Sequence, residues 1–303
     1  MIAVKKNPRH RIRQSHGDAA FDVAVNIVGI AVMLVVLIPL IFVLAASFSD
    51  PELVLRGEVL LIPKGFTLKA YTMVFENEAI WRGYRNTIFY TVAGTIINIV
   101  MTVLAAYPLS RKEMKGRRFF TLVVLFTMYF NGGLIPTYLL VRDLGMYNTV
   151  WAILIPSAIS TYNLIVAKSF FEQSIPLELY ESAKLDGCGS VRTLFAIVLP
   201  LSKAILAVLI LYYGVAHWNA YFNALVYLRD ESLHPLQIVL RNILLLGQTE
   251  QMGSNDVGMG EKIKMVEAIK YSVIVVSSAP ILLLYPLAQR YFVSGVMIGA
   301  VKG

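Results

Sequence analysis

LYESAKLDGCGSVRTLFAIVLP, residues 179–200, is a polar, turn-rich interruption in a strongly apolar chain. Just before it, Ser174 and Pro176 supply the side-chain acceptor and the ring that are typical of a helix start. Apolar positions from Leu177 onward predict a short helix, and Gly187 then allows a backbone turn that is closed to most residues. The expected apolar side of this helix comprises Leu177, Leu179, Tyr180 and Ala183.

A second short helix is expected directly after the turn. Ser190 is suited to cap it, while Arg192 and Thr193 lie off its apolar stripe. That stripe comprises Val191, Leu194, Phe195, Ile197 and Val198. Pro200 marks where this pattern passes into the next apolar run, so the whole stretch is expected to fold back as a compact, partly polar projection.

The composition of the chain indicates a membrane protein. Of its 303 residues, 57% are hydrophobic and 15% are charged, and the mean hydropathy is +0.66. Soluble domains carry about 25% charged residues, so we expect an integral membrane protein. The single cysteine cannot form an internal disulfide. The net charge of +8 could indicate nucleic-acid binding, but its distribution along the chain favours membrane orientation instead.

Six apolar runs are long enough to cross a bilayer, which takes about 20 helical residues. The first follows a basic start, but it is longer than the apolar part of a secretory signal and five more follow, so we expect it to be retained. The expected spans are 23–47, 86–110, 119–141, 148–171, 203–227 and 271–289. Pro136 closely follows Asn131, Gly132 and Gly133, and together they weaken the third span as either a hinge or a simple helix end.

The basic residues orient these spans. With the N-terminus inside, 16 of the 27 Lys and Arg residues fall in cytoplasmic segments, as the positive-inside rule requires. Both termini are then cytoplasmic. The expected organisation is an N-terminal basic segment (1–22), an all-α membrane domain of six transmembrane helices (23–290) and a C-terminal tail (291–303).

Three loops are long enough to carry a function. The polar stretch lies in the cytoplasmic loop 172–202, and two external loops span 48–85 and 228–270. The first external loop has the Pro and Gly residues of a loop with short structured pieces. The second contains an amphipathic stretch at 235–245, and it is either a solvated connector or a docking surface for an external protein.

The polar stretch resembles the EAA motif of bacterial ABC importer permeases, which reads E-A-A-x-x-D-G-A with I-x-L-P downstream. The matching residues are Glu181, Ser182, Ala183, Asp186, Gly187, Phe195, Ile197, Leu199 and Pro200. Two positions depart from the family pattern, because Ser182 and Cys188 stand where alanine is common. Both replacements are small, and the resemblance implies that this loop couples the chain to a separate ATPase.

Further stretches resemble the carbohydrate-uptake branch of this family. HWNAYFNALVYL (217–228) and QRYFVSGVMIGAVKG (289–303) are similar to MalG-like permeases, and FNGGLIPTYLLVRDLGMYNTVWAIL (130–154) and HPLQIVLRNILL (234–245) to the LplC/YtcP-type oligosaccharide permeases. The resemblance implies a type I ABC importer permease fold and oligosaccharide uptake across a bacterial cytoplasmic membrane. It also implies a C-terminal tail, with Gly299, Lys302 and Gly303, that reaches into the ATPase dimer; a disordered end is the other interpretation.

The same resemblance implies the partners. They are a second permease subunit, most simply in a heterodimer, two ABC ATPase subunits, an external solute-binding protein and the lipid bilayer, with no nucleic acid. No G-x-x-x-x-G-K-[ST] phosphate loop occurs in the sequence, so ATP and Mg²⁺ are expected on the ATPase subunits and no cofactor on this chain. No His, Cys and Asp cluster has the spacing of metal ligands either.

Catalysis by the single cysteine has little support in the sequence. A reactive thiol needs a base and an activating environment, and the cytoplasmic histidines, His10 and His16, lie in the basic N-terminal segment. We therefore interpret Cys188 as a small residue that fills a tight turn. The chain is expected to be a transport subunit and not an enzyme.

Polar residues within the apolar runs are candidates for the translocation path. They are Asn131, Tyr162, Asn163, His217, Trp218, Asn219, Tyr221 and Asn223. Aromatic faces and amide groups suit sugar binding, but the same residues could form an interfacial aromatic belt and tie helices together. Both interpretations stay open from the sequence.

Two other classes of function fit the sequence less well. An ion-coupled secondary carrier for a small polar solute would need carboxylates within the membrane, and no Asp or Glu lies well inside any of the six runs. A membrane-embedded hydrolase would need a nucleophile and a base, and no spacing rule supports a pair such as Ser157 and His217. The permease interpretation is favoured over both.

Overall fold

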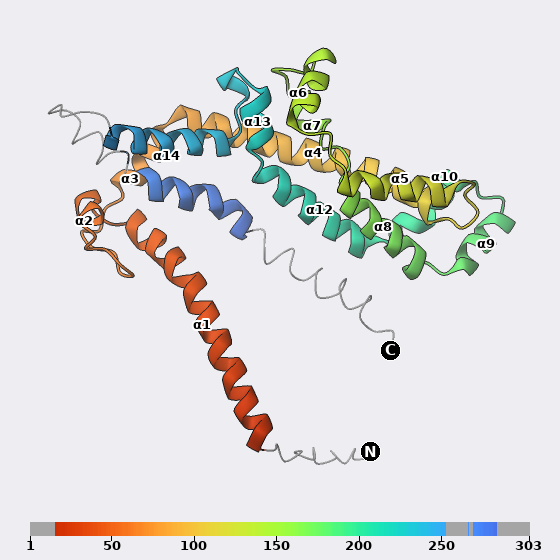
Figure 1. Cartoon of the computed structure of the whole chain (residues 1–303), viewed down its shortest axis with the longest axis horizontal. Coiled ribbons are helices and arrows are strands. Elements are labelled where there is room, and N and C mark those ends of the chain that lie inside the picture. The colour runs from red at the N-terminus through yellow and green to blue at the C-terminus, as the bar shows by residue number, and fades with distance from the viewer. Residues whose placement is uncertain (1–15, 253–265, 267–268, 284–303) are drawn as a thin grey trace, which may run out of the picture. The chain divides into compact units, whose positions relative to one another are not determined.

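The computed structural model describes residues 16–252, 266 and 269–283 of the chain (Figure 1). Throughout this part of the chain the regular elements are helices and no strand occurs, which confirms the all-α class for these residues. The C-terminal tail, with Gly299, Lys302 and Gly303, and the basic start of the chain lie outside the described residues. The chain forms two compact units, residues 1–68 and 69–303, and each is described by itself.

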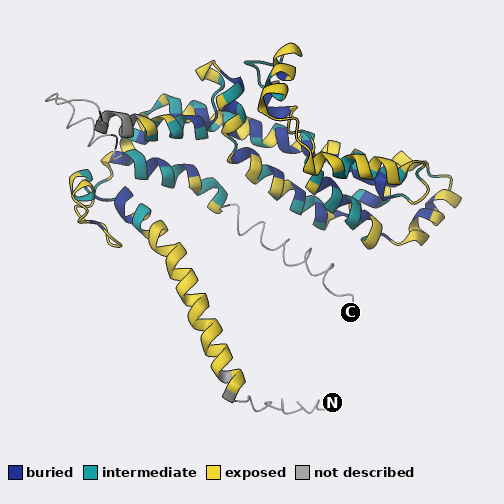
Figure 2. Ribbon diagram, in the orientation of Figure 1, coloured by how far each residue is buried: buried dark blue, intermediate teal, exposed yellow. Residues whose placement is uncertain are grey.

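The first unit consists of one long apolar helix and a short capped helix. Helix α1 (His16–Ser47) contains the apolar stretch Ala20–Ser47, which is long enough to span a membrane, and most of it is exposed (Figure 2). Helix α2 (Pro51–Leu55) begins where the Asp50 carboxylate accepts a hydrogen bond from the Glu52 amide at 2.8 Å. A proline at the first position of this helix lacks the amide hydrogen that would have no partner there.

The second unit is organised around helix α4 (Glu78–Ser110), which follows helix α3 (Lys69–Glu76). Its 33 residues span about 50 Å at 1.5 Å per residue. Helices α8 (Thr161–Ser174), α12 (Lys203–Trp218) and α14 (Leu236–Met252) all pack against it. Figure 1 shows α4 running beside α14 and α12. Helix α4 therefore contacts segments that lie far apart in the sequence.

The other elements of this unit are shorter. They are α5 (Arg117–Tyr129), α6 (Leu134–Asp143), α7 (Trp151–Leu154), α9 (Leu177–Leu185), α10 (Ser190–Thr193), the π-helix η1 (Leu194–Val198), α11 (Leu199–Leu201), α13 (Phe222–Tyr227) and the 3₁₀-helix η2 (Glu231–Leu233). A further apolar helix spans Ile269–Leu283. The amphipathic stretch expected at 235–245 falls in α14.

Three of the expected spans are not continuous helices. The run 119–141 is divided into α5 and α6, which meet at 113°. The reason is local: Gly133 adopts φ +88° and ψ 172°, a conformation essentially restricted to glycine, and the Asn131 side chain accepts a hydrogen bond from its amide. The run 203–227 is also divided, into α12 and α13.

The run 148–171 is also broken, between α7 and α8. Pro156 has no amide hydrogen to continue the first helix, and the Ser160 hydroxyl caps the second. Among the described residues, α1 and α4 alone are long and apolar enough to span a membrane singly, and there are up to four spans if each sharply bent helix pair is one. The expected run 271–289 is described only as far as residue 283, where it is helical.

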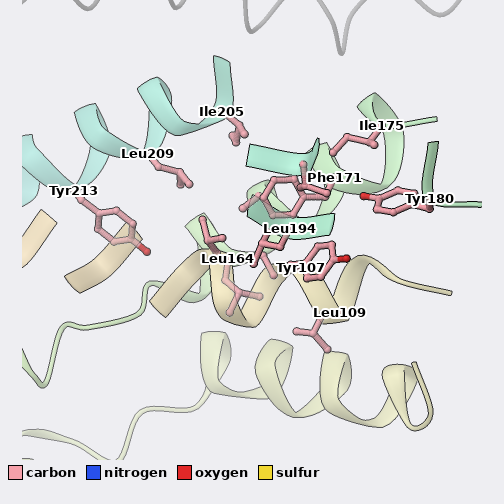
Figure 3. Packing of buried hydrophobic residues seen from close by; sticks show 14 residues of the cluster. Tyr107, Leu109, Leu164, Phe171, Ile175, Tyr180, Leu194, Ile205, Leu209 and Tyr213 are labelled. Carbon is pink, nitrogen blue, oxygen red and sulfur yellow. The ribbon is translucent and has the colours of Figure 1, made fainter. Parts of the chain in front are cut away.

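The largest buried cluster lies where α4, α8, α9, η1 and α12 meet (Figure 3). Its side chains include Tyr107 of α4, Phe171 of α8, Leu194 of η1 and Leu209 of α12. Lipid tails are as apolar as these side chains, so within a bilayer such a cluster stabilises the fold through close packing and not through removal from water. The cluster fixes the polar projection against the long helix α4.

Candidate functional site

The expected glycine turn is present, and backbone bonds hold it. Gly187 has φ +75°, its amide donates to the Lys184 carbonyl at 3.1 Å, and the Cys188 amide donates to the Ala183 carbonyl at 2.8 Å. This pair of bonds is the Schellman motif, which needs a residue in the left-handed conformation and strongly favours glycine there. We name residues 177–193, comprising α9, this turn and α10, the coupling element.

The helix caps of the coupling element differ from the sequence prediction. Ser174 is the last residue of α8 and Pro176 precedes α9, so no serine caps that helix. Ser190 is the first residue of α10 and Gly189 occupies the cap position, with no side-chain bond. Thr193, expected off the apolar stripe, is buried, and its hydroxyl donates to the Gly189 carbonyl at 3.1 Å.

The coupling element turns most of its side chains outward. In α9 only Tyr180 and Ala183 are buried, while the neighbouring Leu177 and Leu179, expected on the same side, are 50% and 38% exposed. The motif residues Glu181, Ser182, Asp186, Gly187, Phe195 and Pro200 are all exposed, and Ala183 is buried. The exposed apolar residues include Leu185 at 89% and Val191 at 71%.

A π-helix and then a sharp bend follow the coupling element. Residues 194–198 form a π-helix, a variant that often occurs at functional sites. The segment Ser190–Leu201 then meets α12 at 83°. Pro200 lies in the short helix α11 immediately before this bend. The apolar stripe expected here is only partly buried, because Leu194 and Val198 face the core while Phe195 is 60% exposed.

Away from the coupling element, a polar cavity of about 200 Å³ lies between α4, the α7–α8 break and α12. Its lining includes the side chains of Asn98, Ser157, Asn163, His217 and Asn223. Residues 155–160 lie in the break, so a continuous helix does not supply hydrogen bonds to all of their backbone groups. Non-helical backbone within a membrane is tolerated where it is buried in protein or lines a watery cavity.

Asn98 connects three elements around this cavity. Its side-chain amide nitrogen donates to the Ser157 carbonyl in the break, and its Oδ1 lies 2.5 Å from His217 Nε2 on α12. Because the Asn98 nitrogen already donates to a carbonyl, its oxygen must accept, and this assigns the proton to His217 Nε2. Asn98 itself is only 1% exposed.

Tyr213 makes a second connection to the break. Its hydroxyl accepts a hydrogen bond from the Ser160 amide at 3.2 Å and lies 2.7 Å from the Thr102 hydroxyl of α4. In the Tyr213–Thr102 pair either hydroxyl can donate. The break is thereby held between α4 and α12 by polar side chains on both.

The sequence pattern of one transport family matches residues 79–298 of the chain. This family is described as the "Binding-protein-dependent transport system inner membrane component". The chain belongs to this family. The match contains both the coupling element and the polar cavity. The family comprises transport permease subunits and not enzymes.

Relatives within the family support the resemblance to LplC/YtcP-type permeases. The permease is 42% identical to the "Polygalacturonan/rhamnogalacturonan transport system permease protein YtcP" of Bacillus subtilis (strain 168), over 89% of this chain and 94% of the relative. It is 39% identical to "Protein LplC" of the same organism, over 97% of this chain and 99% of the relative. The resemblance inferred from the sequence is confirmed.

A solved structure supports the fold as well. A bacterial ABC transporter "involved in the import of the acidic polysaccharide alginate" contains a chain that matches with a TM-score of 0.84 and 33% identity. The match covers 93% of the permease and 99% of that chain. The permease therefore has the fold of an ABC transporter membrane subunit.

The structure places the candidate path residues in different surroundings. Asn163 and His217 line the cavity, together with Asn223. Trp218 is buried elsewhere, where its indole donates to the Ser277 carbonyl at 3.3 Å. The remaining candidates are exposed and are not among the residues that line the cavity: Asn131, Tyr162, Asn219 and Tyr221.

Asn98 is one of the cavity residues that the sequence prediction omitted, along with Ser160, Tyr212 and Tyr213. It is a single amide within an apolar run, and such residues often serve only to tie helices together. A signal was nevertheless present, because Thr87, Thr95, Asn98 and Thr102 recur at helical spacing and are all buried. This polar stripe within an apolar span indicates the face of α4 that turns to the rest of the permease.

Cys188→Ala is expected to change transport by less than about twofold. The Cys188 amide makes the turn bond and its side chain is half-buried, so alanine keeps both the backbone bond and the small volume. The measurement is ATP-driven uptake by the reconstituted transporter, compared at equal abundance of the permease. A loss of uptake in a fully assembled transporter would contradict this interpretation.

Proposed function

We propose that the permease is the membrane-spanning subunit of an ATP-driven importer for an oligosaccharide. It would cross the bacterial cytoplasmic membrane six times with both termini inside. A second permease subunit, most simply a different one, would complete the path, and an external solute-binding protein would deliver the sugar. Two ABC ATPase subunits would supply hydrolysis and hold ATP and Mg²⁺.

The observation that carries the proposal is the form of the coupling element. Its turn is closed by backbone bonds and its inner side is anchored by Tyr180 and Ala183, so it keeps its shape without help from its outer side chains. Those outer side chains combine exposed apolar and charged groups, among them Leu185 and Glu181. A rigid surface of this kind suits docking to a soluble partner.

Oligosaccharide uptake is supported by the relatives and by the chemistry of the cavity. The names of relatives include polygalacturonan and rhamnogalacturonan transport and, at 28% identity, "Arabinooligosaccharides transport system permease protein AraQ" of Halalkalibacterium halodurans. The described cavity lining combines amides and hydroxyls with an imidazole and tyrosines. Such groups bind neutral hydroxyls by hydrogen bonding and ring faces by stacking.

The mechanism we propose is mechanical. ATP would draw the two ATPase subunits together, and the coupling element, seated on one of them, would move with it. Inward- and outward-facing states of the path would then differ in their contacts with the ATPases, so nucleotide binding would shift the balance between them. In the same proposal the C-terminal tail, with Gly299, Lys302 and Gly303, extends into the ATPase dimer.

The test is reconstitution of the permease with its partner permease and ATPases in lipid vesicles. Hydrolysis and uptake are measured with the external binding protein loaded from a panel of oligosaccharides. We expect uptake to require ATP on the side of the membrane that carries the ATPase subunits, and to persist when ion gradients are collapsed. Uptake that follows an ion gradient without ATP would contradict the proposal and favour a secondary carrier.

A further inference from the structure

Helix α9 of the coupling element is anchored to the rest of the permease through few side chains. In α9, whose nine residues are all described, the buried residues are Tyr180 and Ala183. The connection from α8 runs through Ile175 and Pro176, which are both extended and form no helical turn. A connection of this kind can pivot, so a side chain that braces α9 passes a push on more directly.

Tyr180 is the side chain that can brace α9. It is 7% exposed and belongs to the same buried cluster as Tyr107 of α4 and Phe171 of α8 (Figure 3). The guanidinium carbon of Arg111 lies 3.4 Å from the centre of the Tyr180 ring. Arg111 is the residue that ends α4. A planar guanidinium stacked on an aromatic face is a specific contact that lysine reproduces poorly.

Arg111 is itself held in place. Its backbone amide donates to the Pro108 carbonyl at 3.0 Å, and its guanidinium lies 3.6 Å from the Glu113 carboxylate. Nearby, Arg117 donates to the Leu109 carbonyl at 2.9 Å and pairs with Glu172 of α8. The end of α4 is therefore fixed, and Arg111 presents a defined face to Tyr180.

Helix α4 leads from this contact to the polar cavity. Asn98, which binds the α7–α8 break and His217, lies on α4, and Arg111 directly follows the last residue of that helix. The two residues are about 20 Å apart along the axis at 1.5 Å per residue. A helix is stiff over this length, so a displacement at one end of the segment changes the position of Asn98 at the other.

We propose that the Arg111–Tyr180 stack is the mechanical connection through which movement of α9 reaches α4 and the polar cavity. This inference rests on the proposed coupling of the element to an ATPase. It assigns Arg111 and Tyr180 as positioning residues, because neither lines the cavity and both act through α4. It also makes α4, and not only the helices that flank the loop in the sequence, the carrier of the nucleotide signal.

The test follows the accessibility of the cavity in the assembled transporter, without any sugar. A single reporter cysteine replaces Ala220, which lines the cavity, in a Cys188→Ala chain assembled with its partner permease and ATPases in lipid nanodiscs. The probe is a water-soluble maleimide, and its rate of reaction is compared between the nucleotide-free and the ATP–vanadate-trapped states. With Arg111 and Tyr180 intact, we expect the two rates to differ at least fivefold.

Arg111→Gln and Tyr180→Leu are each expected to reduce this difference to less than twofold, while ATP hydrolysis stays within twofold of the parent. The double variant should be no worse than either single variant. Tyr180→Phe keeps the ring and should show the same difference between the two rates as the parent. If Tyr180 acted only through its hydroxyl, this variant would lose the difference. The matched control is Arg118→Gln, which removes the same charge from an exposed position in α5.

The outcomes separate the two proposals. If the parent transporter shows no nucleotide-dependent difference, the proposed coupling to an ATPase fails. If the parent shows it and both Arg111→Gln and Tyr180→Leu retain it, the stack is not the connection. If Arg111→Gln fails to assemble with the ATPases, the comparison of Tyr180→Leu with Tyr180→Phe answers the same question. If Tyr180→Leu fails to assemble, the comparison of Arg111→Gln with Arg111→Lys answers it.

Discussion

Gly187→Val is expected to lower ATP-driven uptake at least tenfold while leaving the permease in the membrane at normal abundance. Gly187 has φ +75°, which costs a residue with a side chain about 1–2 kcal/mol and a β-branched residue more. Each 1.4 kcal/mol lowers the ratio of the correct turn to other conformations about tenfold. Because the bonds of Gly187 and Cys188 close the turn, we expect the coupling element to lose its shape. The measurement is uptake and ATP hydrolysis by the reconstituted transporter.

Gly189→Val is the matched control for this prediction. A side-chain carbon would meet nothing within 4 Å at either glycine, and Gly189 has φ −70° and ψ 161°, which suits valine. The two variants therefore differ mainly in the sign of φ. Gly187→Asn should fall between the parent and Gly187→Val, because asparagine tolerates the left-handed region. Equal losses in both valine variants would show that the turn conformation does not matter.

Gly94→Ala is expected to destabilise the permease by about 2–3 kcal/mol, because overpacking and a broken buried hydrogen bond add together. A side-chain carbon on Gly94 would overlap the imidazole of His217, which must then leave Asn98. In proteins of comparable size this corresponds to a fall in melting temperature of about 5–10 °C. The measurement is thermal unfolding of the purified, assembled transporter, together with uptake.

Gly214→Ala provides the comparison on the facing helix. Its side-chain carbon would lie 3.9 Å from the Thr95 hydroxyl, an ordinary contact, so we expect no loss and a gain of up to about 1 kcal/mol from the helix interior. A double variant of Gly94→Ala with His217→Ala should be no less stable than His217→Ala alone. If Gly94→Ala and Gly214→Ala lower the melting temperature equally, the overlap with His217 is not the cause.

Much of the fold follows from patterns that depend only on residue type. The helices α1 and α4 correspond to the first two expected spans. Helix α4 begins at Glu78, eight residues before the expected span, because a search for apolar runs does not detect its polar first turns. The glycine turn at Gly187 was predictable because backbone conformation and glycine are tightly linked. The family motif added the expectation that Asp186 and Gly187 matter more for function than the cysteine beside them.

Other features depend on contacts that one sequence does not display. The break at residues 155–160 lies within a run that is apolar enough for a single span, and the bonds from Asn98 and Tyr213 that help to satisfy its backbone are visible in the structure alone. The predicted cap of the second helix was wrong for a related reason, since Ser190 has a suitable side chain but Gly189 occupies the cap position. The hinge at Asn131 was left open by the sequence, and the conformation of Gly133 places a sharp bend there.

The backbone-closed turn of the coupling element has a consequence for cells that contain many related transporters. Because the bonds of residues 183–188 come from main-chain groups, exposed side chains such as Leu185 and Val191 can change without unfolding the element. Paralogous permeases can therefore diverge on this outer surface and keep their mechanics. Under the proposed docking of this element to an ATPase, substitutions there would change which ATPase is recruited, so that a few solvent-facing residues on a shared backbone would set the cross-talk between parallel uptake systems.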